Sequence, residues 1–129
     1  MGSLKTILLL DDCATIRTIL KVYLMNLGAD YVEAADGATA LLYLESRKID
    51  LVIADVRMSP MDGISFVDHL RSHLQEGLRA VPVILLTSDL DESLRTRGLQ
   101  AGANAFVHKP ISAPALQDAI GRIFPRLCA

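Results

Sequence analysis

Four short apolar runs without polar alternation constrain the fold of this chain more than any other feature of its sequence. A strand that exposes one face to water alternates apolar and polar residues, whereas a strand covered on both faces stays apolar throughout. The runs are therefore typical of strands in a parallel sheet with helices on both sides. They span residues 7–10, 51–54, 83–86 and 105–107.

Segments with helical spacing separate these runs. The clearest has apolar residues at i, i+3, i+4, i+7, i+8 and i+11 from Ile16 to Leu27, and Gly28 then supplies a stop. Residues 31–34 are a weaker strand candidate. Further helices are predicted at residues 38–47, after Gly63, from near Asp91, and at residues 113–124. The expected apolar faces are Ala38, Leu41, Leu42 and Leu44; then Ile64, Val67, Leu70 and Leu74; then Leu94, Leu99 and Ala101.

This alternation of five strands with five helices predicts an α/β fold built on a doubly wound parallel sheet. Right-handed crossovers place the helices on both faces of such a sheet. The length of 129 residues fits one compact unit, so we expect a single domain over residues 1–129.

Composition and charge argue against several classes of protein. Although 51% of the residues are hydrophobic, no apolar run approaches the roughly 18 residues that a membrane span needs. Lys and Arg number 13 against 15 Asp and Glu, with no basic stripe, so we expect no direct contact with nucleic acid. Cys13 and Cys128 belong to no CxxC pattern, which favours a reducing compartment, by default the cytoplasm.

Reactive side chains follow the four strong runs. Because ligands of open parallel sheets bind beyond the carboxyl ends of the strands, we expect these side chains to meet in one crevice, with three acids facing one lysine. Asp11 and Asp12 follow residues 7–10, Asp55 follows 51–54, Thr87 follows 83–86, and Lys109 lies just beyond 105–107.

Three neighbouring carboxylates repel one another unless a hard cation lies between them, and Mg²⁺ fits oxygen ligands best. With the cation held by Asp11 and Asp12, the carboxylate of Asp55 can act as a nucleophile toward a phosphoryl group. The ammonium of Lys109 and the hydroxyl of Thr87 can both contact that group. The pattern therefore predicts an aspartyl phosphate at Asp55.

In the order and spacing of these residues, the chain resembles a response-regulator receiver domain over nearly its whole length. The resemblance implies a flavodoxin-like sheet with strand order 2-1-3-4-5 and a cis peptide bond before Pro110. It implies that Mg²⁺ is bound directly by Asp12, Asp55 and the backbone carbonyl of Arg57, with Asp11 acting mostly through water. It also implies that Thr87 and the aromatic side chain of Phe106 form the switch.

The same resemblance implies a signalling module more than an enzyme, whose only chemistry is transfer to Asp55 and slow hydrolysis there. The donor would be a sensor histidine kinase or a histidine phosphotransfer protein. The recipient of the signal would be a downstream protein target or an output domain absent from this chain. The implied interaction face is formed by the fourth predicted helix, the fifth strand and the fifth predicted helix, and two copies could also pair through it.

The sequence departs from the usual receiver pattern near the site. Ser59 stands where proline is common, with Pro60 after it, and Ser88 stands where a smaller residue is usual. Arg57 and Asp89 lie two residues beyond Asp55 and Thr87, and our hypothesis is that this pair obstructs an attacking water and lengthens the lifetime of the phosphoryl group.

Two other functions stay open at this stage. A Mg²⁺-dependent phosphatase with an aspartyl nucleophile would use similar carboxylates, but it usually has a second acid where this chain has Arg57. A nucleotide or flavin binder of flavodoxin type is weaker, because the stretch DDCATIR is not a glycine-rich phosphate loop. His69 and His73 have the spacing of a metal pair, yet a solvated helix face is favoured over a metal site.

Overall fold

The computed structural model describes residues 4–58, 61–88 and 92–124. Its centre is a five-stranded parallel sheet in the order β2-β1-β3-β4-β5, which confirms the predicted sheet and strand order. Each strand is one residue longer than the segment that predicted it. The strands are β1 (Thr6–Leu10), β2 (Asp30–Ala34), β3 (Leu51–Asp55), β4 (Val83–Thr87) and β5 (Ala105–His108).

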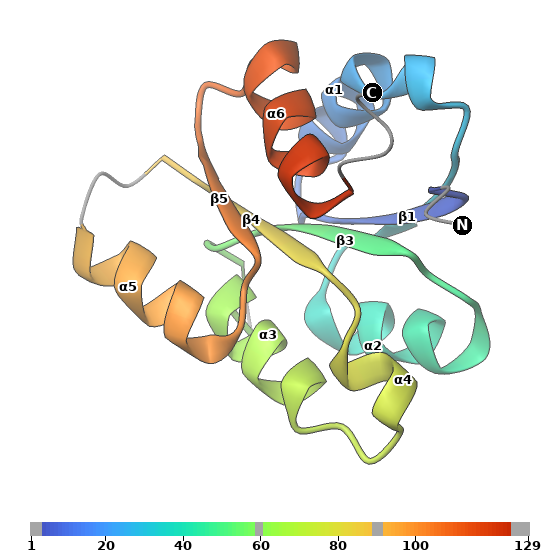
Figure 1. Ribbon diagram of the computed structural model, residues 1–129, viewed down its shortest axis with the longest axis vertical. Helices are drawn as coiled ribbons and strands as arrows, with labels where there is room; N and C mark the ends of the chain where they lie inside the picture. The colour runs from blue at the N-terminus through green and yellow to red at the C-terminus, as the bar shows by residue number, and fades with distance from the viewer. Residues whose placement is uncertain (1–3, 59–60, 89–91, 125–129) are drawn as a thin grey trace.

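Helices cover both faces of the sheet, as expected. α1 and α6 lie on one face, and α2, α3 and α5 lie on the other (Figure 1). The long helices are α1 (Ala14–Tyr23), α2 (Gly37–Ser46), α3 (Gly63–Arg71), α5 (Glu92–Ala101) and α6 (Ala113–Ile123). The described residues also contain a one-turn helix, α4 (Glu76–Arg79), and a 3₁₀ turn, η1 (Met25–Leu27), so the expected number of five helices is corrected. The sequence of α4, EGLR, has a single apolar side chain, too few for a periodic pattern to reveal it.

Successive side chains of each central strand point into two separate cores, which explains the lack of polar alternation. On β1, Leu8 and Leu10 pack beneath α2 and α3, whereas Ile7 and Leu9 pack beneath α1 and α6. Every residue of β3 and β4 is buried. The strands are thereby packed on both sides, and the side chains predicted to be reactive lie at their carboxyl ends.

The apolar face predicted for the second helix is wrong in part. Ala38 and Leu42 are exposed, the latter at 65%, because α2 turns Gly37, Ala40 and Leu44 toward the sheet. A helix of 10 residues with several apolar side chains does not reveal from its sequence alone which of them are buried.

Two further positions differ from the expected helix faces. Leu74 is 96% exposed because α3 ends at Arg71, one turn earlier than expected. Leu99 is 41% exposed, since Gly98 occupies the buried side of α5. The predicted stop at Gly28 is confirmed by its left-handed φ of 65°, although the α-helix itself ends earlier and η1 lies between.

Candidate functional site

The carboxyl ends of the strands bring the predicted reactive residues together at one edge of the sheet. One carboxylate oxygen from each of Asp11, Asp12 and Asp55 lies within 4.8 Å of the other two. Lys109 Nζ is 2.9 Å from Asp55 Oδ2 and 4.0 Å from Asp11 Oδ2. Thr87, the last residue of β4, is also buried at this edge. The expected crevice, with three acids facing one lysine, is confirmed.

Only one of the two carboxylate oxygens of Asp11 accepts a hydrogen bond from the described residues. Its side chain is 1% exposed, and Oδ1 accepts a hydrogen bond of 2.9 Å from the backbone N–H of Cys13. Oδ2 is buried and has no hydrogen-bond partner among the described residues. Burial raises the pKa of Asp11 to about 6; the Cys13 hydrogen bond opposes this rise, and the charge of Asp55 adds to it. Ionisation of this buried acid therefore costs free energy.

Asp55 is held at the end of β3 by contacts on both carboxylate oxygens. Oδ1 accepts from the backbone N–H of Arg57 at 3.3 Å, and Oδ2 accepts from Lys109 Nζ. The side chain is 10% exposed, so it is not fully sealed from solvent. A cleft lined by Asp12, Val56, Arg57, Met58, Asp62 and Leu94 adjoins the site.

The residues of the crevice fit a hard divalent cation. Three carboxylates outnumber the single ammonium of Lys109, and Oδ2 of Asp11, which accepts no hydrogen bond from the described residues, could bind such an ion. Mg²⁺ takes oxygen ligands at about 2.0–2.1 Å and keeps several of its waters. Two direct ligands of such an ion lie at most about 4.2 Å apart, so carboxylate oxygens within 4.8 Å of one another need only a small side-chain movement, or an intervening water, to share one ion. The acidic triad is a metal site.

The two residues expected to form the switch lie on neighbouring strands. The backbone carbonyl of Thr87 accepts a hydrogen bond of 2.8 Å from the N–H of Lys109, which ties the ends of β4 and β5 together. Phe106 lies on β5 opposite Leu85 of β4. Its ring is half-buried against Gly98 of α5, where a Cβ atom would lie 2.4 Å from two ring carbons. The ring is thus in direct contact with the helix that it is expected to influence.

The remaining sequence expectations concern the loops around the site. The peptide bond between Lys109 and Pro110 is cis, as expected. Ser88 is exposed, whereas Ser59, Pro60 and Asp89 lie outside the described residues, so the hypothesis on Arg57 and Asp89 stays a prediction.

The two histidines of α3 and its C-terminal loop make separate contacts. His69 Nδ1 lies 2.8 Å from the carbonyl oxygen of Ser65, and His73 Nε2 lies 2.8 Å from Glu45 Oε2. Within the described ranges, the acidic triad is the one group of three or more potential metal-ligating side chains, and neither histidine belongs to it.

Gly63, which opens α3, packs directly against the strand end that carries Asp55. A Cβ atom at position 63 would lie 2.4 Å from the carbonyl oxygen of Asp55 and 3.0 Å from its carbonyl carbon. Backbone atoms cannot rotate away, so we expect Gly63→Ala to lower the free energy of unfolding by about 1–3 kcal/mol in a urea titration. The control is Gly77→Ala in α4, where a Cβ would meet nothing within 4 Å and stability should rise slightly or stay unchanged. Wild-type stability in Gly63→Ala would contradict this close approach.

Comparison with known proteins decides the family. The model of the response regulator receiver domain matches residues 7–121. The chain belongs to this family. The receiver domain is 37% identical over 122 residues to the chemotaxis protein CheY of Pseudomonas aeruginosa, covering 94% of this chain and 97% of that protein.

Two solved structures place this receiver domain among its relatives. The chemotaxis protein CheY4 of Vibrio cholerae superposes with a TM-score of 0.84 at 28% identity, covering 93% of this chain and 98% of that one. The receiver domain of the sensor histidine kinase PA1611 of Pseudomonas aeruginosa superposes with a TM-score of 0.82 at 32% identity, covering 94% and 98%. That structure has a magnesium ion coordinated in its active site cleft.

Receiver domains are phosphorylated on an aspartate in two-component signalling, with a histidine kinase as partner, and are signalling proteins rather than conventional enzymes. In the described part of this receiver domain, no helix has the length and apolar character needed to cross a membrane.

Proposed function

We propose that this receiver domain accepts a phosphoryl group on Asp55 from a sensor histidine kinase or a histidine phosphotransfer protein. The observation that carries the proposal is the arrangement around Asp55. Its carboxylate lies beside the ammonium of Lys109 and within 4.8 Å of two further acids, one of which has a buried oxygen without a hydrogen-bond partner. Asp55 is thus a nucleophile beside two positive charges, the ammonium of Lys109 and the cation that the acids would bind.

The residues divide the chemistry among themselves. A carboxylate oxygen of Asp55 forms a bond to phosphorus while the bond to the donor breaks, and the donor leaves with that electron pair. Lys109 donates hydrogen bonds to the phosphoryl oxygens and balances their charge. Asp11, Asp12, Asp55 and the backbone carbonyl of Arg57 would hold Mg²⁺. When bound, this ion neutralises charge on the transferring group.

The phosphoryl group is then read by the switch residues. It brings roughly two negative charges and three acceptor oxygens to the end of β3, which favours a position of Thr87 with its hydroxyl turned toward the group. Phe106 fills the space that Thr87 leaves, and because its ring contacts Gly98, α5 moves with it. The phosphoryl group shifts the population between two packings only as far as its contacts differ between them.

The surface that changes is the face formed by α5, β5 and α6. It has a cleft lined by residues from all three elements, among them Arg95, Phe106, His108 and Arg122. We propose that this face binds a downstream protein target or an output domain, and that two copies of the chain can pair through it. The proposal places the protein in the cytoplasm, as a single receiver domain over residues 1–129.

Turnover of a phosphate ester tests this function against that of a phosphatase. The purified protein with Mg²⁺ should acquire one phosphoryl group from acetyl phosphate and should not hydrolyse p-nitrophenyl phosphate in a steady state, because Arg57 occupies the place of the second acid that such phosphatases use. Intact mass measures the first result and release of p-nitrophenol the second. Sustained multiple turnover of the ester would favour the phosphatase.

A further inference from the structure

The two acids at the start of the site, Asp11 and Asp12, are joined by a single peptide group. The orientation of this group sets the directions in which both carboxylates leave the backbone. The N–H of Asp11 donates to the carbonyl of Ala34 at the end of β2, at 3.1 Å. Its C=O belongs to the peptide between the two acids and lies beyond β1, which ends at Leu10, so a partner outside the strand must hold it.

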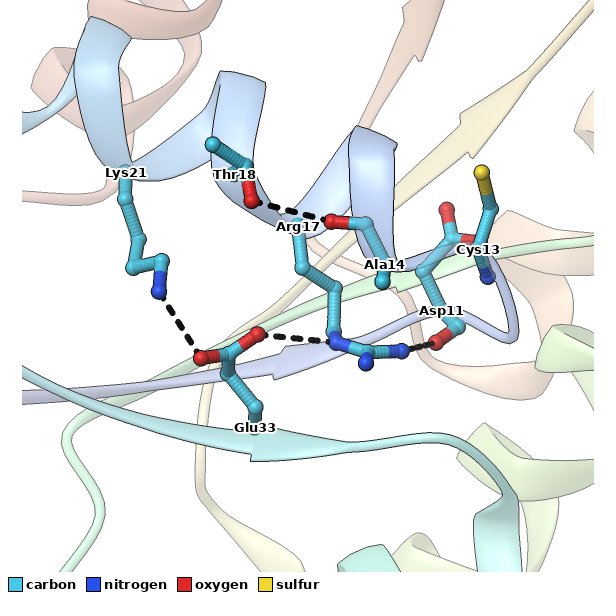
Figure 2. Close-up of polar contacts among 7 residues, drawn as sticks. All are labelled: Asp11, Cys13, Ala14, Arg17, Thr18, Lys21 and Glu33. Carbon is cyan, nitrogen blue, oxygen red and sulfur yellow. Dashed lines mark hydrogen bonds and ion pairs between the residues drawn. The ribbon is translucent and has the colours of Figure 1, made fainter.

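Arg17 of α1 is that partner. Its Nη1 donates to the carbonyl oxygen of Asp11, and its Nε donates to Glu33 Oε1 at 2.9 Å. Figure 2 shows the guanidinium between these two acceptors. The side chain of Arg17 is only 16% exposed, so water competes poorly for these contacts. Glu33 directly precedes Ala34 on β2. The end of β2 therefore holds both backbone groups of Asp11: Ala34 accepts from the N–H, and Glu33 holds Arg17, which donates to the C=O.

Lys21, one turn further along α1, provides a matched comparison. Its Nζ pairs with the other carboxylate oxygen of Glu33, Oε2, at 2.8 Å. Figure 2 shows Lys21 on the side of Glu33 away from Asp11. Hydrogen bonds from Lys21 and Arg17 hold the pKa of Glu33 below its usual value, so this carboxylate remains an ionised anchor. Both cations share Glu33, but the contact to the peptide between the acids comes from Arg17.

We propose that Arg17 is a positioning residue for the acidic site, which fixes the peptide between Asp11 and Asp12 so that both carboxylates point toward one divalent cation. This inference rests on the proposed function, because it assigns a role toward the same cation. Groups that orient metal ligands, without touching the metal, typically contribute 10–100-fold to affinity. A guanidinium suits the task because its planar fork of donors can hold two acceptors in fixed directions, which a lysine ammonium cannot.

The test is a titration with Mg²⁺ alone, without a phosphodonor, of wild type, Arg17→Met, Arg17→Lys and Lys21→Met. Backbone amide NMR signals of Cys13 and Arg57 report binding, because these groups donate to the carboxylates of Asp11 and Asp55. We expect both Arg17 variants to bind Mg²⁺ about 10-fold more weakly or worse, and Lys21→Met to stay within about twofold of wild type. Before Mg²⁺ is added, the Cys13 signal should shift in the Arg17 variants and stay in place in Lys21→Met.

Wild-type affinity in either folded Arg17 variant, or an equal loss in Lys21→Met, would overturn the positioning role. Should Arg17→Met fail to fold, Arg17→Lys still decides the question, since it keeps the charge and most of the side-chain stem. A wild-type protein that binds no Mg²⁺ would instead refute the proposed function.

Discussion

Asp55→Asn protein is expected to acquire no phosphoryl group from acetyl phosphate and Mg²⁺, under conditions in which the wild type acquires one. An amide lacks the nucleophilic carboxylate oxygen that forms the bond to phosphorus. The substitution also removes the negative charge that pairs with Lys109, whose Nζ lies 2.9 Å from Asp55 Oδ2. Asparagine has nearly the same shape and its oxygen can still accept from the N–H of Arg57, so the fold should be retained.

Intact-mass spectrometry measures this result, with a circular dichroism spectrum to confirm folding. The matched control is Asp118→Asn, which removes an exposed carboxylate that pairs with Arg122 on α6 at 3.1 Å. This variant should be phosphorylated like the wild type. Equal phosphorylation of Asp55→Asn and wild type would mean that another side chain accepts the group.

Asp11→Asn is expected to raise the stability of the metal-free protein at neutral pH. The pKa of Asp11 rises from 3.8 to about 6 on folding, mainly through burial. With such a raised pKa, ionisation of the buried acid lowers the stability of the folded state by roughly 3 kcal/mol. The amide oxygen can still accept from the N–H of Cys13, so the variant should gain about 2–3 kcal/mol in free energy of unfolding.

The pH dependence of this gain follows from the direction of the shift. Because the folded state binds the proton more tightly than the unfolded state, wild-type stability falls as pH rises from about 4 to about 6. The two proteins should therefore be similar in stability near or below pH 3.8 and differ fully above about pH 6. Urea titrations in the presence of a chelator measure this difference. A variant less stable than wild type at neutral pH would show that the carboxylate is not strained in the metal-free fold.

Addition of Mg²⁺ should reverse this order. Ligand that binds only the folded state stabilises it, and the wild type retains all three carboxylates of the site. Asp11 therefore lowers the stability of the protein without Mg²⁺ and raises its affinity for Mg²⁺.

The strands and the site could be predicted from the sequence because both depend on local patterns. A run such as residues 51–54 is buried on both faces wherever it lies in a parallel sheet, and Asp55 must then emerge at the strand end. The carboxyl ends of parallel strands meet at one edge, so Lys109 was expected near Asp55 before any distance was known. The strand-end pattern placed Thr87 at the site, but the switch role of Thr87 and Phe106 came from the family resemblance.

Helix faces and long-range polar contacts could not be predicted in the same way. Leu42 and Leu99 are apolar but exposed, and short amphipathic segments do not distinguish such residues from core residues. No sequence pattern marks Arg17, because its contact with the carbonyl of Asp11 depends on how α1 docks beside β2. The close approach of Gly63 to Asp55 likewise exists only in three dimensions.

The central claim is that the carboxylate of Asp55 becomes the phosphorylated group, and locating the acyl phosphate tests it most directly. Borohydride reduces an acyl phosphate to an alcohol, which converts the modified aspartate to homoserine. After treatment with acetyl phosphate and Mg²⁺, followed by borohydride, peptide mass spectrometry should find homoserine at position 55. Homoserine at position 11 or 12, or at none of the three, would contradict the account.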